Sequence, residues 1–174
     1  MDKLNSLFEC LNGVCRLVAA SAEQLLADPF RSLLIHLRPR QVTCPDPGMK
    51  AALLSLKELN RSNLSCSPIS PLTQQYQFYD KIIDGLEACW VHEAFVLDWL
   101  VDAGESFQVD IQKGDTFATL LLVFWEVALH RLNRYWFASG TGKMLVEMAT
   151  ENLRTNDMQV SVSVAWVRAQ VGQD

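Results

Sequence analysis

The segment from Thr116 to Phe137 constrains the fold most, because it is apolar on nearly every side of a helix. One broad face of that helix carries a set of apolar side chains: Phe117, Leu120, Leu121, Phe124, Val127, Ala128 and Leu129. Leu122, Val123 and Trp125 cover most of the opposite face. A helix without a polar face must be enclosed by protein. Its apolar stretch is shorter than the roughly 20 residues that cross a bilayer. We therefore expect a buried central helix at 116–137 and no membrane span.

The composition is that of a globular protein with one core. Apolar residues make up 49% of the 174 positions and charged residues 20%. These values exclude general disorder, and the length suits a single domain over 1–174. The net charge of -5 argues against broad contact with a nucleic-acid backbone, although a local basic patch is compatible with it.

Helical spacing of apolar residues and helix-capping residues predict about seven helices in an all-α domain. The expected helical segments besides the central one are 2–26, 28–37, 49–59, 71–90, 92–103 and 143–153. Loops are expected near 38–47, 60–70, 104–114 and 138–142, where Pro, Gly, Ser and Asn gather or the pattern turns polar. Asp115 is the expected N-cap of the central helix.

The segment 158–171 fits two structures. Val160, Val162 and Val164 alternate as in a strand, whereas Val160, Val164, Val167 and Val171 form a helical stripe. A strand would have no partner in an all-helical protein. We predict a helix.

Two arrangements of these helices agree with the sequence. One is a multi-helix bundle, and the other is a short solenoid of HEAT-like two-helix repeats, because two helix pairs recur about 44 residues apart. A hydrophobic central helix is also found in apoptosis-regulator bundles. Their Asn-Trp-Gly-Arg signature is absent here, so that analogy concerns architecture alone.

The cysteines predict a reducing compartment. There are five, at positions 10, 15, 44, 66 and 89, with no CxxC pair and no histidines at zinc-site spacing. An odd, scattered set is a poor disulfide framework. We expect free thiols and an intracellular protein, cytoplasmic or nuclear.

Motifs for catalysis, metal binding and cofactor binding are incomplete. The run Gly140-Thr141-Gly142-Lys143 resembles the end of a phosphate-binding loop, but Phe137 and Met144 stand where the full pattern needs Gly and Ser or Thr. His92-Glu93 lacks the second histidine of a zinc-protease helix. Asp80, Asp84 and Glu87 share a helix face without a histidine at ligand spacing and are expected to form a solvated acidic face. We predict no enzyme activity, metal or cofactor.

Cationic and aromatic residues concentrate at the end of the central helix. They are His130, Arg131, Arg134, Tyr135 and Trp136. Arg and aromatic side chains are enriched at binding hot spots, and His130 and Arg134 lie four residues apart. These five residues are the predicted partner-binding site. Trp90, Trp99, Trp136 and Trp166 are too many for one small core, so at least one is expected to face a partner.

The sequence therefore predicts a helical scaffold or adaptor, a subunit of a larger complex that binds other proteins in a surface groove. The complex could be a hetero-complex or a homo-oligomer. The alternative is a nucleic-acid-associated module that uses the cluster around 130–136 together with Arg38 and Arg40.

Overall fold

The computed structural model of the chain describes residues 47–64, 71–93, 95–135, 138–153 and 157–172, with the isolated positions 9 and 13. These ranges hold six helices: α3 (Pro47–Leu64), α4 (Pro71–Val91), α5 (Phe95–Gln112), α6 (Thr116–His130), α7 (Thr141–Asn152) and α8 (Met158–Val171). The predicted all-α class is confirmed for this part of the chain. The helices expected at 2–26 and 28–37 lie outside the described residues, as does the loop at 38–47 except for its last residue.

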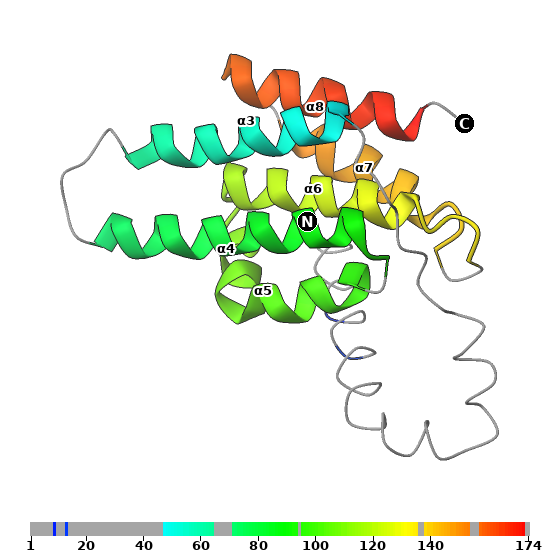
Figure 1. Ribbon diagram of the computed structural model, residues 1–174, viewed down its shortest axis with the longest axis horizontal. Coiled ribbons are helices and arrows are strands. Elements are labelled where there is room, and N and C mark those ends of the chain that lie inside the picture. The colour runs from blue at the N-terminus through cyan, green and yellow to red at the C-terminus, as the bar shows by residue number, and fades with distance from the viewer. Residues whose placement is uncertain are drawn as a thin grey trace.

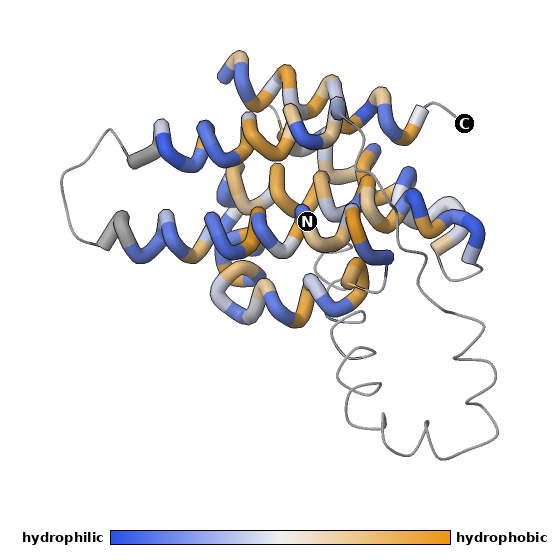
Figure 2. Tube along the Cα trace, viewed as in Figure 1, coloured by the Kyte–Doolittle hydropathy of each residue, from blue (hydrophilic) through white to orange (hydrophobic). Residues whose placement is uncertain are grey.

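The helices pack around one hydrophobic core (Figure 1). Helix α6 contacts α4, α5, α7 and α8, and α3 packs against both α4 and α8. In Figure 2 hydrophobic and hydrophilic residues alternate along the outer helices, which is the pattern of amphipathic helices around a core. Among the described helices, none is both long and apolar enough to cross a membrane.

Helix α6 is buried along almost its whole length. Every residue from Phe117 to His130 is buried. The Asp115 side chain caps its N-terminus and accepts a hydrogen bond of 2.7 Å from the Ala118 amide, as the sequence predicts. Just before it, Gly114 ends α5 in a left-handed conformation, with φ at 77°. The Gly114 amide donates a hydrogen bond to the Ile111 carbonyl, and the Asp115 amide donates one to the Asp110 carbonyl. These two bonds form the Schellman pattern of a helix end.

The central helix is shorter than the sequence predicts. It ends at His130, whereas we expected it to reach Phe137. After Arg131 the backbone amides bond three residues back, Leu132 to Leu129 and Asn133 to His130, and the chain continues in turns through residue 134. The Asn133 side chain accepts a hydrogen bond of 2.8 Å from the Gly140 amide and holds the connection to α7.

Gly142 explains why α7 begins so close to the end of α6. A Cβ atom on Gly142 would lie 2.6 Å from the His130 Cα and 2.7 Å from the Glu126 carbonyl oxygen, and closer still to the His130 nitrogen. These are backbone atoms, which have no rotamer by which to move away. The absence of a side chain at 142 therefore permits the contact between the two backbones.

Helix α5 is longer than the sequence predicts. Residues 105–112 are helical, although a polar connection was expected at 104–114. Gly104 interrupts the helix with a φ of 75°, which divides it into two parts. The second part buries Phe107 and Ile111, one turn apart, and this two-residue apolar face is too short to stand out in the sequence.

The other elements follow the sequence more closely. Helix α3 extends to Leu64, into the loop expected at 60–70, whose remaining residues are not described. The prediction of a helix at 158–171 is confirmed, with Val160, Val167 and Val171 buried. Asp157 caps that helix through the amides of Gln159 and Val160.

We predict that Gly142→Ala destabilises the protein by about 3 kcal/mol or more, because the added methyl group overpacks a contact between two backbones. Chemical denaturation monitored by circular dichroism measures this loss. Gly140→Ala is the comparison. Gly140 has a positive φ, of 72°, but no atom lies within 4 Å of its would-be Cβ, so the cost there comes from the backbone conformation and should be about 1 to 2 kcal/mol. Equal losses for the two variants would contradict the close packing assigned to Gly142.

Candidate functional site

The basic and aromatic residues predicted as a site are largely engaged within the chain. His130 is the last residue of α6 and is only 7% exposed. Contrary to the sequence-based expectation, it therefore does not share an exposed helix surface with Arg134. The Arg131 guanidinium lies 4.6 Å from the centre of the Trp90 ring and donates a hydrogen bond of 3.5 Å to the Trp90 carbonyl. Trp136 lies outside the described residues.

Arg134 and Tyr135 bind Glu93, which lies between α4 and α5. Arg134 forms an ion pair with the Glu93 carboxylate and donates a hydrogen bond of 2.8 Å to the Tyr135 hydroxyl. The Tyr135 hydroxyl donates in turn to Glu93, at 3.4 Å. The structure thus brings Arg131, Arg134 and Tyr135 onto the α4–α5 connection, where they fasten the end of α6.

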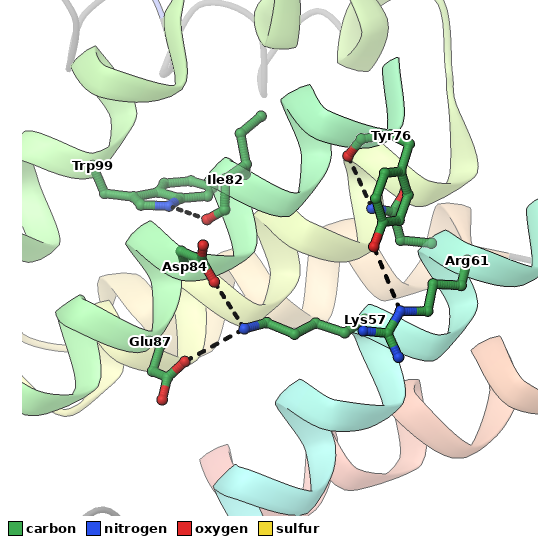
Figure 3. Close-up of polar contacts among 8 residues, drawn as sticks. Lys57, Arg61, Tyr76, Ile82, Asp84, Glu87 and Trp99 are labelled. Atoms are coloured by element: carbon green, nitrogen blue, oxygen red, sulfur yellow. Dashed lines mark hydrogen bonds and ion pairs between the residues drawn. The ribbon is translucent and has the colours of Figure 1, made fainter. Parts of the chain in front are cut away.

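Other motifs noted in the sequence also have roles in packing. Gly140 and Gly142 form the turn into α7, and Lys143 is exposed. Figure 3 shows the Lys57 ammonium of α3 between two carboxylates of α4, 2.8 Å from Asp84 and 3.7 Å from Glu87. Among the described residues, no group of three or more His, Cys, Asp or Glu side chains could hold a metal ion.

The most distinct apolar hollow among the described residues lies between α4 and α5. It is a groove of about 350 Å³. Its walls are Phe78, Lys81, Ile82, Gly85 and Ala88 from α4, and Phe95, Trp99, Asp102 and Ala103 from α5. Phe95 is 45% exposed, although it is a large aromatic residue. We refer to this surface as the α4–α5 groove.

Trp99 fixes the geometry of the α4–α5 groove. Its indole N–H donates a hydrogen bond of 3.0 Å to the Ile82 carbonyl across the two helices (Figure 3). The ring lies so close to Gly85 that a Cβ there would be 2.9 Å from Trp99 Cδ1. The Trp99 ring also stacks on the Trp125 ring of α6 and contacts the Phe107 ring edge-on. The groove is therefore held rigidly on the central helix.

Two rim residues of the α4–α5 groove are charged. Lys81 lies on the α4 wall and Asp102 on the α5 wall. Both are exposed, and no ion pair within 4.0 Å joins them in the part of the chain that the structure describes. The groove thus combines an apolar floor with one charge of each sign on opposite walls.

A second hollow, of about 610 Å³, lies between α7 and α8. Its lining includes Glu151 and Arg168 and contains no aromatic side chain. The α4–α5 groove is the better candidate because its lining is largely apolar and includes aromatic side chains.

The sequence analysis did not single out the residues of the α4–α5 groove as a site. Trp99 was among the tryptophans expected to serve a partner-facing surface, yet it is buried, as is Trp90, so both fill the core. The wall residues have the helical spacing of ordinary core positions, and that spacing does not tell which of them stay uncovered. Gly85, an isolated glycine within a helical pattern, was the available signal of a close approach.

Among the described residues, Glu126 is the buried carboxylic acid whose environment is strongly unfavourable to charge. It is 1% exposed in the middle of α6, and neither side-chain oxygen has a hydrogen-bond partner among these residues. Burial raises its pKa well above the ordinary value. The folded state therefore favours the neutral form of this carboxyl group.

The buried thiol of Cys89 is also unsuited to chemistry. It is free and donates a hydrogen bond to the Phe95 carbonyl, at 3.3 Å. Burial raises its pKa to about 12, so the reactive thiolate is scarce. The other four cysteines lie outside the described residues.

No protein-family model matches the sequence, and no curated protein or solved structure matches it significantly. A functional assignment must therefore come from the chemistry of the chain's own surfaces.

We predict that Glu126→Gln removes a pH-dependent loss of stability. Below the ordinary carboxyl pKa of about 4.3, the folded and unfolded chains both hold the proton. Above it, the unfolded chain releases the proton while the folded chain keeps it. The free energy of unfolding therefore falls by up to about 1.4 kcal/mol per pH unit until the raised folded pKa is reached. The variant should gain stability relative to the parent over that range.

Urea denaturation at a series of pH values from about 4 to 8 tests this dependence. The control is Glu147→Gln, at an exposed position on α7. Its stability difference from the parent should stay nearly constant with pH. A Glu126→Gln profile parallel to that of the parent would show that Glu126 ionises normally in the folded state.

Proposed function

We propose that this protein is a non-catalytic interaction module that binds a helical segment of a partner protein in the α4–α5 groove. The observation that carries this proposal is the exposed Phe95 beside a rigid, aromatic-floored groove. Aromatic residues in a well-packed pocket are the usual anchors of a protein interface.

The two walls of the groove suit a helix. Lining positions on α4 recur at residues 78, 81, 82, 85 and 88, and those on α5 at 95, 99, 102 and 103. Each set is one face of a helix, and a third helix laid between two such faces packs its side chains into their grooves. The α4 wall extends about 15 Å at 1.5 Å per residue, which accommodates roughly three turns of a partner helix.

Rigidity of the groove favours binding. The floor residue Trp99 is fixed by the Ile82 carbonyl and by Trp125 of α6. A partner would therefore order few side chains on this protein when it docks, and the entropy cost of binding is reduced. We further propose that the fold is a closed bundle rather than a row of two-helix repeats. In repeats each unit contacts its neighbours alone, whereas here α3 contacts α8.

We place the partner on the groove rather than on the cluster of Arg131, Arg134 and Tyr135. Those side chains bind Trp90 and Glu93 within the same chain. The same contacts weaken the nucleic-acid alternative, because Glu93 neutralises one of the two arginines. Arg38 and Arg40, which that alternative also uses, lie outside the described residues.

We predict that Phe95→Asp weakens binding of a helical peptide at least tenfold while stability changes by about 0.5 kcal/mol or less. The change removes an exposed anchor and places a charge in an apolar groove. Stability is spared because Phe95 is half exposed and begins a helix, where a carboxylate is favourable. The probe is a peptide selected on the full-length protein from a displayed library of amphipathic helices of about 16 residues.

The matched control is Leu54→Asp. Leu54 is 66% exposed on α3, so this change places the same charge on another exposed apolar residue outside the groove. Its peptide affinity, measured by fluorescence polarisation, should equal that of the parent. If no helical peptide is selected, or if Phe95→Asp and Leu54→Asp bind equally well, the groove is not the binding site.

A further inference from the structure

We infer that the helix that docks in the α4–α5 groove is charged asymmetrically, with a basic side chain on the flank facing Asp102 and an acidic side chain on the flank facing Lys81; this inference rests on the function proposed above. Lys81 and Asp102 carry opposite charges on the two walls of the groove, and neither forms an ion pair within the part of the chain that the structure describes.

The α5 wall is acidic and has no cation of its own. Helix α5 carries Asp98, Asp102, Glu105 and Asp110 and no Lys, Arg or His, and of these four acidic residues Asp102 lines the groove. Asp98 and Asp102 lie one turn apart, and both are exposed. Burial raises the pKa of Asp98, and repulsion from Asp102 raises it further. A positive charge that approaches this edge of the groove therefore stabilises the ionised form of these carboxylates.

The α4 wall has the opposite character where it lines the groove. Lys81 is the only cationic residue in α4. Its helix neighbours Asp80 and Asp84 are not groove-lining residues, and Asp84 is bound by Lys57 of α3. Lys81 is therefore the charged side chain that a docked helix meets on the α4 wall.

The two walls together select one direction for the docked helix. A helix that turns its apolar face into the groove presents one flank to α4 and the other to α5. Reversal of its direction exchanges the flanks, so a helix with a basic and an acidic flank places like charges together in one of the two directions. Electrostatic complementarity of this kind fixes register and excludes wrong partners more than it adds affinity. The rigid groove supplies affinity and the rim charges supply orientation.

The test is a second selection on the full-length protein from a library of amphipathic helices of about 16 residues. Apolar residues occupy positions i, i+3, i+4 and i+7, and both flanks are randomised among Arg, Glu and Gln. We expect the parent protein to enrich peptides with Arg on one flank and Glu on the other. The variant Lys81→Asp, in which both walls carry an acidic rim residue, should enrich peptides with Arg on both flanks, and Asp102→Lys should enrich peptides with Glu on both flanks.

Binding constants make the expectation quantitative. Replacing the Glu flank of a selected peptide by Arg should weaken binding to the parent protein about tenfold and strengthen binding to Lys81→Asp by a similar factor. Glu147→Lys, a charge reversal on exposed α7, is the control and should leave the preference for opposite charges on the two flanks unchanged. Circular dichroism and the melting temperature establish that each variant is folded.

The outcomes separate this inference from the proposed function. Peptides that bind and lose affinity on Phe95→Asp, but show no preference for opposite charges on their two flanks, would support the groove and overturn the charge assignment. The absence of any groove-dependent peptide would overturn both. A preference for opposite flank charges that Lys81→Asp converts into a preference for Arg on both flanks would support both.

A photo-crosslinking residue, p-benzoylphenylalanine, placed at position 95 identifies the occupant of the groove. Crosslinking to an added selected peptide supports the inference. The segment 2–26, expected from the sequence to be an amphipathic helix with cations at Lys3 and Arg16, lies outside the described residues. If the crosslink instead joins residue 95 to that segment, or to a second copy of the chain, the groove is occupied by this protein itself and the inference is wrong.

Discussion

The enclosure of α6 is the constraint on which the rest of this structure depends. Because Phe117 to His130 are all buried, the helix needs neighbours on every side, and α4, α5, α7 and α8 supply them. The largest side chain of α6, Trp125, donates a hydrogen bond to the Val96 carbonyl of α5 and stacks on Trp99. The position of α5 against α4, and with it the shape of the α4–α5 groove, follows from this contact.

The same enclosure accounts for the unusual state of Glu126. A carboxyl group in the middle of a helix that is covered on all sides has no route to solvent, and desolvation favours its neutral form. Replacement of such a group by an apolar residue is often neutral or stabilising, so packing alone gives no reason for a carboxyl group at this position.

Local signals in the sequence predicted well those features that depend on neighbouring residues. Asp115 is an N-cap, and 158–171 is a helix, because a cap and a helical stripe involve only adjacent turns. The end of the central helix was misplaced because it depends on a distant contact. Residues 131–135 read as helix, yet Gly142 packs on the His130 backbone and Asn133 holds Gly140. The segment after Gly104 was predicted as a loop because most of its residues are polar, although it is helical and buries Phe107 and Ile111.

The candidate site was harder to predict than the fold, for a physical reason. Arginine carries several hydrogen-bond donors and tyrosine carries one, each at the end of a long side chain, so a cluster of them suits a partner and an internal carboxylate equally well. Here Glu93 takes that place. The groove, in contrast, is formed by residues such as Phe78, Ile82 and Phe95, which have the spacing of a core. Whether such a face is covered depends on where the other helices pack. A binding groove is thus a property of packing, and its charged rim becomes visible only after the neighbouring helices are placed.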